Sequence, residues 1–428
     1  MNTRRPLLFL SSWAVVVSGF VYLGLLGLLG GLAGVAASAC ATDNGDNTYG
    51  PDYGPLPKRD GAADADGVLQ DGSTDPDDAG DEEDATAACT SGTIAVLAGN
   101  DGALTAAVQE KNGAWVTSTI AGGAAKSKPA LVTFGAGFLG ATHGAADALQ
   151  STTYDGAGWS GASAFGNAGV KGAPTLAVAG TKAHVVYSAG TGANRDFAHG
   201  VHDGTSWNAA TAQVGPPPSF GTVSAGLAAA GSEVVMAENG SDNGLYVRSF
   251  DGSWSASSGI VGAGTLGSTI PATPEIVAVD GAFDLLLVYV EKDTYRIASA
   301  TRDAASKAWV DRDPIQDAAT TEEKLSLARI SPSTVLLTFR GQDDNGYYAQ
   351  ATIGAGTVTW SAPQPIGGAG PFAVDSTPAV AKGVCGDDAV VAYATGGVVR
   401  VTRLRAGTWT SPEAVGTASG TRVAIATK

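Results

Sequence analysis

Apolar and polar residues alternate in short runs along residues 90–428, and the runs recur in a fixed order. A run with period two, such as Leu245–Phe250 (LYVRSF), leads into a turn that a Trp follows. An apolar run of the buried type, such as Leu285–Tyr289, comes earlier in each unit, and several units begin with a Pro-led run such as Pro174–Ala177. Period-two alternation is typical of β-strands. Each unit therefore predicts four short strands, which we name A to D.

Tryptophan marks the repeat. Outside the first 39 residues, neighbouring Trp residues lie 44 to 55 positions apart, at Trp115, Trp159, Trp207, Trp254, Trp309, Trp360 and Trp409. Turn signals such as Asp203-Gly204 and Asp251-Gly252 precede them, and Asp-Gly favours tight hairpin turns because both central residues adopt positive φ. A four-strand repeat of about this length is typical of a β-propeller blade. We interpret the Trp residues as blade packing, with stacking on a sugar as the alternative.

The two ends of the repeat region complete each other. Residues 92–120 supply strands B, C and D of a unit but no strand A, and Thr421–Ala426 (TRVAIA) is a lone strand. Pairing the last strand with the first three closes the ring and removes its exposed edges. The predicted fold is all-β: a seven-bladed β-propeller with four-stranded blades and a 3+1 closure of the N- and C-terminal strands.

Charge and composition divide the chain into three parts. Residues 1–39 have a basic start and a long uncharged run, residues 40–88 form an acidic stretch rich in Asp, Gly, Ala and Pro, and residues 89–428 hold the repeats. Residues 40–89 carry −12 of the formal net charge of −16. Such a stretch buries too little apolar surface to fold, so we expect a disordered linker. Nucleic acid is excluded as a partner because phosphate binding requires clustered cations.

The first part predicts export. Residues 37–40 (ASAC) place small residues before Cys40, as a signal-peptide cleavage site requires. A Cys directly after such a site resembles the bacterial lipobox, which implies acylation of Cys40 and a lipoprotein of the outer membrane, periplasm or cell surface. A plainly cleaved secreted protein and an uncleaved membrane segment are the alternatives, because the apolar run is long enough to span a bilayer.

Cysteine parity follows from this interpretation. If Cys40 carries the lipid, Cys89 and Cys385 remain, and they are able to pair in an oxidising compartment. Cys89 precedes strand B of the composite blade, and Cys385 lies in the A–B turn of the last complete unit. Both positions fall on the same face of neighbouring blades, so we predict a disulfide close to the seam of the ring. Two unpaired thiols are the alternative.

The hairpin around Trp159 resembles the Asp-box of bacterial BNR-repeat, sialidase-like propellers. Thr153–Trp159 (TYDGAGW) is similar to that box, and the units also look like those of seven-bladed sugar-binding propellers. The resemblance implies a site with three arginines, a Tyr–Glu pair and an Asp. Of the arginines, Arg329 and Arg422 fall on predicted inner strands, which does not assemble a triad. We expect binding rather than catalysis, with a sialidase-type glycosidase as an alternative.

Ligand contacts in propellers usually come from the B–C and D–A loops of one face. The polar side chains of these loops, with neighbouring aromatic and basic residues, form our candidate binding site: Tyr187, Arg195, Glu238, Asp242, Arg340, Asp343 and Asp344. Their hydroxyl-binding groups suit a glycan or another surface polymer, and a scaffold for envelope proteins is the alternative function. No metal or cofactor motif is present, so we expect none, with Ca²⁺ at the Asp clusters as the alternative. We expect a monomer.

Overall fold

The computed structural model divides into two units, of which the second, Gly80–Lys428, holds all the described residues. It describes residues 91–166, 169–190, 196–208, 212–213, 224–239, 244–260, 273–291, 294–312, 314–316, 319–321, 323–368 and 370–428. The predicted export segment, the acidic linker, Cys40, Cys89, Arg195 and Asp242 lie outside the described residues. In the part that is described, no helix is long and apolar enough to cross a membrane.

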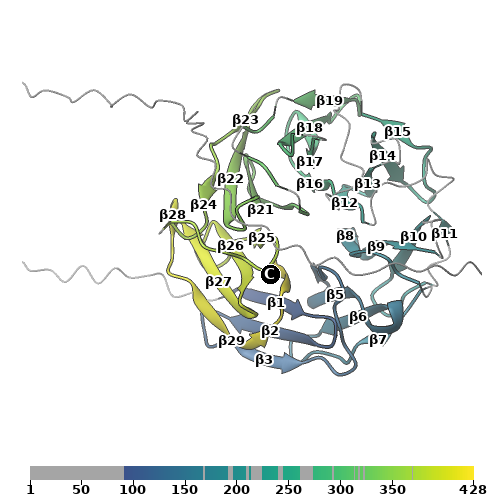
Figure 1. Cartoon of the computed structure of the whole chain (residues 1–428). Helices are drawn as coiled ribbons and strands as arrows, with labels where there is room; N and C mark the ends of the chain where they lie inside the picture. The colour runs from purple at the N-terminus through teal and green to yellow at the C-terminus, as the bar shows by residue number, and fades with distance from the viewer. Residues whose placement is uncertain are drawn as a thin grey trace, which may run out of the picture. The chain divides into compact units, whose positions relative to one another are not determined.

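The second unit is a ring of seven antiparallel sheets, as the sequence predicts (Figure 1). We number these sheets as blades 1 to 7 along the chain. Blade 1 is the composite blade, made of β1 (Thr93–Gly99), β2 (Leu104–Glu110), β3 (Val116–Thr119) and β30 (Arg422–Thr427). Blade 2 contains β4 (Ala130–Phe134), β5 (Gly137–His143), β6 (Leu149–Tyr154) and β7 (Ser163–Ala164). Blade 3 contains β8 (Thr175–Ala179), β9 (Lys182–Ala189), β10 (Asp196–His202) and β11 (Ala212–Gln213).

The remaining four blades repeat this order. Blade 4 contains β12 (Gly226–Ala230), β13 (Glu233–Asn239), β14 (Leu245–Phe250) and β15 (Ser258–Gly259). Blade 5 contains β16 (Glu275–Ala278), β17 (Phe283–Val290), β18 (Ile297–Asp303) and β19 (Trp309–Arg312). Blade 6 contains β20 (Ser326–Ser331), β21 (Thr334–Arg340), β22 (Gly346–Ile353), β23 (Val358–Trp360) and β24 (Gln364–Pro365). Blade 7 contains β25 (Ala379–Lys382), β26 (Ala389–Thr395), β27 (Val398–Arg405), β28 (Thr408–Trp409) and β29 (Glu413–Ser419).

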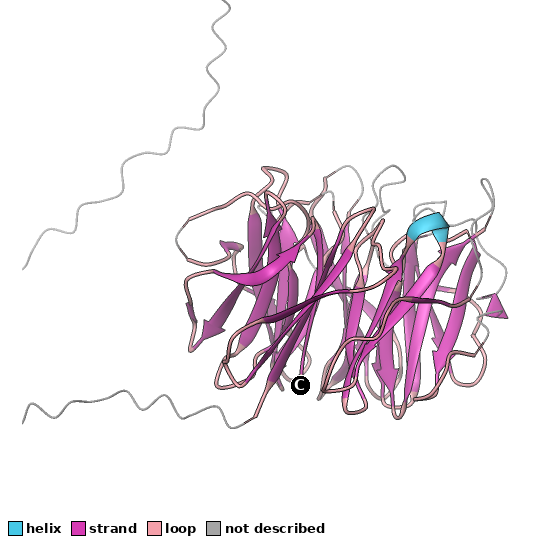
Figure 2. Cartoon of the chain, turned by 90° about the horizontal axis from the view of Figure 1, so that it is seen from below, coloured by secondary structure: helices cyan, strands magenta, loops and turns pink. Residues whose placement is uncertain are grey.

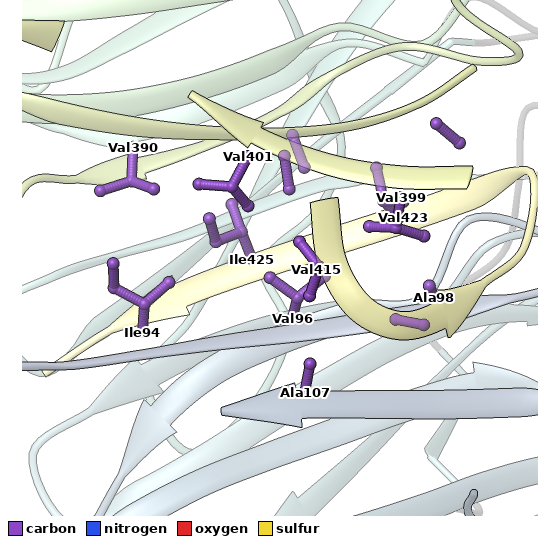
Figure 3. Close-up of a cluster of buried hydrophobic side chains, with 14 of the residues drawn as sticks. Ile94, Val96, Ala98, Ala107, Val390, Val399, Val401, Val415, Val423 and Ile425 are labelled. Carbon is purple, nitrogen blue, oxygen red and sulfur yellow. The ribbon is translucent and has the colours of Figure 1, made fainter. Parts of the chain in front are cut away.

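The ring closes through the predicted 3+1 pairing. β30 pairs with β1 from Ile94↔Thr427 to Gly99↔Arg422, and Thr93 and Lys428 exchange two further backbone hydrogen bonds of 2.8 and 2.9 Å. Val423 and Ile425 of β30 pack with Val96 of β1 and with strands of blade 7 in one apolar cluster (Figure 3). The alternate residues of β30 pack towards blade 2, so this one strand buries both of its faces.

Two blades contain a fifth strand that the sequence analysis does not predict. β24 pairs with β22, and β29 pairs with β27, in each case beyond the strand that carries the Trp. Pro363 and Pro412 lie at the two interruptions, and a proline has no N–H to donate to a ladder. The fifth strand is therefore the second half of a broken strand D, and the blades remain four strands wide.

The seven tryptophans lie between blades. Each is partly buried and packs against an apolar cluster. The indole N–H of Trp207 donates to Ser151 of blade 2 at 3.0 Å, and that of Trp360 donates to Ser299 of blade 5 at 3.2 Å. The Trp of one blade thus contacts the preceding blade, which supports the interpretation as blade packing.

The Asp residues of the turns before the Trp residues stabilise those turns. Asp203 accepts hydrogen bonds from the backbone N–H groups of Thr205 and Ser206, and Asp303 accepts them from Ala305 and Ser306. The hydrogen bonds lower the pKa of both carboxyl groups below the usual range. These C–D turns therefore act in folding the blade, whatever the ring binds.

The two faces of the ring differ in what they carry. The D–A and B–C connections lie on one face, together with the short 3₁₀ helix η1 (Ala145–Asp147), which is cyan in Figure 2. The C-terminus and Ser91, the first described residue, lie on the opposite face, because Thr93 pairs with Lys428 at the far end of β30. Cys385 lies on this second face with its sulfur 3.4 Å from the carbonyl oxygen of Ser91. Cys385 is disulfide-bonded, and its predicted partner Cys89 is outside the described residues.

Candidate functional site

A bowl of about 450 Å³ opens at the centre of the D–A face, and we call it the mouth. It is built mainly from the segments that enter the inner strands, and the residues that line it are Lys126, Ser127, Lys128, His143, Lys171, Gly172, Ala173, Ser224, Thr273, Glu323, Lys324, Asp375, Ser376, Thr377, Thr421 and Arg422. Every blade contributes to this set. The mouth is therefore a product of ring closure.

One position recurs around the mouth. It lies two residues before β4, β8, β12, β16, β20 and β25, and it holds Lys128, Ala173, Ser224, Thr273, Lys324 and Thr377. In four of these blades the next residue is a proline, which restricts the preceding residue to an extended backbone and needs no hydrogen-bond acceptor. The local sequence thus fixes the direction of the chain as it enters the inner strand.

Below the mouth lies a narrow channel between the inner strands. The second position of six inner strands lines it with an aliphatic residue that also packs in a cluster between blades, and these residues are Leu131, Leu176, Leu227, Ile276, Leu327 and Val380. Charged residues line the channel as well, among them Glu275. The volume there is about 180 Å³. Lys128 and Lys324 line both the mouth and the channel, so they lie where the bowl meets the channel.

The mouth is cationic although the chain as a whole is acidic. Two carboxylates line it, Glu323 and Asp375, and the lining cations outnumber them: Lys126, Lys128, Lys171, Lys324 and Arg422. The net charge of the chain is −16, so the cations are concentrated here against the general composition. Carboxylates behind the lining, Asp147, Glu275 and Asp101, lie within 4 Å of four of these cations and offset their charge.

Carboxylates outside the mouth hold several of its cations. Asp147 of η1 accepts from Lys126 Nζ at 2.8 Å, lies 3.1 Å from His143 Nε2 and 3.9 Å from Lys171 Nζ. The hydrogen bonds with Lys126 and His143 lower the pKa of Asp147 to about 2. Burial lowers the pKa of His143 despite this neighbouring carboxylate, so the imidazole is neutral at pH 7. The rim is thus a network of positioned charges.

Three of the predicted site residues meet at the edge of the mouth. Arg340, at the end of β21, forms an ion pair with the mouth residue Glu323 and donates to Asp344 Oδ1 at 2.6 Å. Asp343 accepts hydrogen bonds of 2.7 Å from both Tyr347 Oη and Asn345 Nδ2. Burial would raise the pKa of Asp343, but these hydrogen bonds lower it below its usual value. Asp343 and Asp344 are both exposed, and the two hydrogen bonds hold the Asp343 side chain within its loop.

The structure does not bring the other described candidates to this surface. Tyr187 is fully buried in the cluster between blades 2 and 3. Glu238 is also fully buried, and its Oε1 accepts a 2.9 Å hydrogen bond from Arg248 Nε within blade 4. Burial raises the pKa of Glu238 although Arg248 opposes the shift. Arg195 and Asp242 lie outside the described residues.

Among the described residues, the lining of the mouth contains neither an arginine triad nor a metal-ligand cluster. Arg422 is the single arginine among the described residues that line the mouth. Arg329, on β20, forms an ion pair of 2.6 Å with Asp280. Within the described ranges, no group of three or more His, Cys, Asp or Glu side chains is arranged to hold a metal ion.

Sequence reasoning missed the lysines of the mouth. These residues, Lys126, Lys128, Lys171 and Lys324, lie in D–A segments, whereas most of the predicted site residues lie at B–C loops rich in Asp and Asn. The residue before the Pro that begins strand A is a signal that would have found Lys128. It is readable in the sequence once strand A is placed on the inside of the ring.

Comparisons with known proteins support the fold. A search against protein-family models and a search of curated proteins found no match. Among solved structures, the BP39L lectin from Burkholderia pseudomallei is similar, with 18% identity, a TM-score of 0.60, and coverage of 75% of this chain and 95% of that chain. A mutant of AofleA from Arthrobotrys oligospora is similar with 14% identity, a TM-score of 0.51, and coverage of 70% and 88%. The chain shares the propeller fold with these proteins.

Proposed function

We propose that the protein is an exported, lipid-anchored propeller that binds glycans or similar surface polymers at the mouth. The observation that carries the proposal is the mouth itself: about 450 Å³, with polar and charged side chains from several blades around it. Ligand sites of small molecules typically have such volumes, with a few convergent polar groups on an apolar base. A sugar matches the polar side chains of the mouth, since it presents hydroxyls along its edge.

Two further observations support the proposal. A protein that shares the fold, BP39L, is a lectin. The chain enters the propeller at Ser91, on the face opposite the mouth. A tether from a lipid at Cys40 that joins this face leaves the mouth open to the surroundings.

The mouth can be tested by filling it. Thr421 is exposed at the mouth, so Thr421→Trp places an indole in the bowl without removing a buried group. We expect the full-length wild-type protein to bind a subset of an array of microbial and host glycans, and the variant to lose at least about 90% of that signal because the volume is occupied.

Thr181→Trp is the matched control, because Thr181 is an exposed turn residue between β8 and β9 on the opposite face. It should bind the same glycans as the wild type. Binding retained by Thr421→Trp, or lost equally in both variants, would place the glycan site elsewhere. An array that stays blank for the wild-type protein would argue against the function.

The lipid anchor is tested separately. We expect mass spectrometry of the full-length protein from a bacterial host to find a mature chain that begins at an acylated Cys40, and Cys40→Ser to abolish both the acylation and the membrane fraction. A mature chain that starts at residue 40 without lipid, or an intact residue 1, would instead support secretion or an uncleaved segment.

A further inference from the structure

Lys128 differs from the other cations of the mouth in having no carboxylate partner. Lys126 and Lys171 lie beside Asp147, and Lys324 Nζ is 3.1 Å from Glu275 Oε1. Arg422 donates to Asp101 Oδ1 at 2.8 Å. Among the described residues, Lys128 forms neither an ion pair nor a side-chain hydrogen bond, and it is half-buried at the junction of mouth and channel.

The carboxylates of the mouth are already engaged by other donors. Glu323 pairs with Arg340, and its Oε2 accepts from the backbone N–H of Thr377 at 3.1 Å. Asp375 accepts from the backbone N–H groups of Gly396 and Gly397 at 3.0 and 2.7 Å. These contacts hold both acids in the rim, so neither neutralises Lys128 by direct contact.

The charge of Lys128 is therefore kept at an energetic cost. Burial and the like charge of Lys324 lower the pKa of Lys128 to about 8, while Glu275 and Glu323 oppose the shift from a greater distance. An unpaired, partly desolvated cation gains most from an anion that enters its site, because such a contact restores the interaction that burial removed.

Resting on the glycan-binding function proposed above, we propose that the mouth selects acidic sugars, and that Lys128 binds their anionic group. The group is a uronate carboxylate or a sulfate ester, because either one is a compact anion that an ammonium binds as a point charge. Lys324 lies beside the same junction and adds a second positive charge to it. The anion enters the centre of the bowl, and the sugar ring lies against the rim.

The test compares matched ligands on the full-length protein. Calorimetric titrations use galacturonate oligomers, heparin-type sulfated oligosaccharides, neutral galactose oligomers and inorganic sulfate. We expect one or both acidic series to bind at least tenfold more tightly than the neutral one. Lys128→Met should reduce that affinity about 10- to 100-fold, as expected for the loss of a charge-assisted hydrogen bond, and should leave any neutral binding unchanged.

Lys382→Met is the control, because Lys382 is exposed at the opposite end of inner strand β25. Lys382→Met removes the same charge as Lys128→Met, so the long-range attraction of an anionic sugar changes equally in both variants. We expect Lys382→Met to bind the acidic sugars with wild-type affinity. A thermal melt of each variant checks folding, and Lys128→Arg, which keeps the charge, should retain most of the acidic-sugar affinity.

The outcomes separate this inference from the general function. Equal affinity for acidic and neutral oligomers, or acidic binding that Lys128→Met does not weaken, overturns the selection by Lys128 and leaves glycan binding standing. If no oligosaccharide binds but sulfate does, with a loss in Lys128→Met, the mouth is an anion site and the glycan function fails. If only the galacturonate oligomers bind, the anionic group is a carboxylate. If only the heparin-type oligosaccharides bind, it is a sulfate ester.

Discussion

Removal of residues 421–428 is expected to abolish cooperative folding of the propeller. β30 is the inner strand of blade 1, and Val423 and Ile425 are at most 7% exposed. Their burial contributes about 2 kcal/mol each. The truncation also exposes the edge of β1 and the apolar surfaces of blades 2 and 7 that β30 covers. Together, the lost burial of β30 and the exposure of the surfaces that it covers are on the order of the whole stability of a domain, about 5–15 kcal/mol.

Circular dichroism during heating checks this expectation. The full chain should show one sharp transition, and the truncated chain should show none or a broad one at much lower temperature. Removal of Lys428 alone is the control, because it deletes two backbone hydrogen bonds with Thr93 and leaves β30 intact. A peptide of residues 420–428 added to the truncated protein should restore part of the transition. A truncated chain that melts within about 5 °C of the wild type would show that the ring does not depend on its closing strand.

Acid is expected to destabilise the propeller through a buried histidine pair in blade 3. His184 Nδ1 and His199 Nε2 are 3.0 Å apart, their rings stack, and His199 also contacts Phe250 and Trp254 of blade 4. Burial, with a smaller contribution from His184, lowers the pKa of His199 to about 4. The unfolded chain binds a proton to this residue near pH 6.5, so it holds more protons than the native state between pH 6.5 and 4.

Because the unfolded chain binds more protons in this range, the free energy of unfolding decreases as the pH falls. The contribution of neutral His199 is complete above pH 6.5, and it is lost as the pH falls towards 4. Its size is about 3 kcal/mol at most, as an order of magnitude for a side chain that is 4% exposed. Urea unfolding at pH 7.5, 5.5 and 4.5 should show this decrease in the free energy of unfolding.

His199→Gln should flatten the profile, because the amide does not titrate and still offers a hydrogen bond to His184. His202→Gln is the matched control in the same strand, at a residue that is similarly buried but lies outside the pair. It should remove a smaller part of the slope. Parallel profiles for wild type and His199→Gln would exclude the pair as the acid-sensitive element.

The strands and their order could be predicted from short stretches of sequence. The run Leu245–Phe250 is β14, the Pro174-led run is β8, and TRVAIA is β30. Each assignment depends on period two, a turn residue or a proline, and these act over a few residues. The broken strand D at Pro363 was readable by the same rules, since a proline within a strand interrupts its ladder.

The site was less predictable, and the reason differs between residues. Arg340, Asp343 and Asp344 lie at the B–C connection where the sequence places them, because this loop follows directly from the strand assignment. Tyr187 and Glu238 also lie near the ends of strands, but Tyr187 packs between blades 2 and 3, and Glu238 is buried against Arg248 of the neighbouring strand. Which neighbour covers such a side chain depends on the packing of two blades, and periodicity within one blade does not contain that information.

The sequence by itself determined the repeat, the count of blades, the identity of the closing strand and the position of each Trp. Only the tertiary structure determined the mouth. Lys128 and Lys324 are distant in the chain, and each looks like an ordinary polar residue before an inner strand. They share one bowl because ring closure brings the entrances of all inner strands to a common centre, and burial there gives a lysine without a partner its altered pKa.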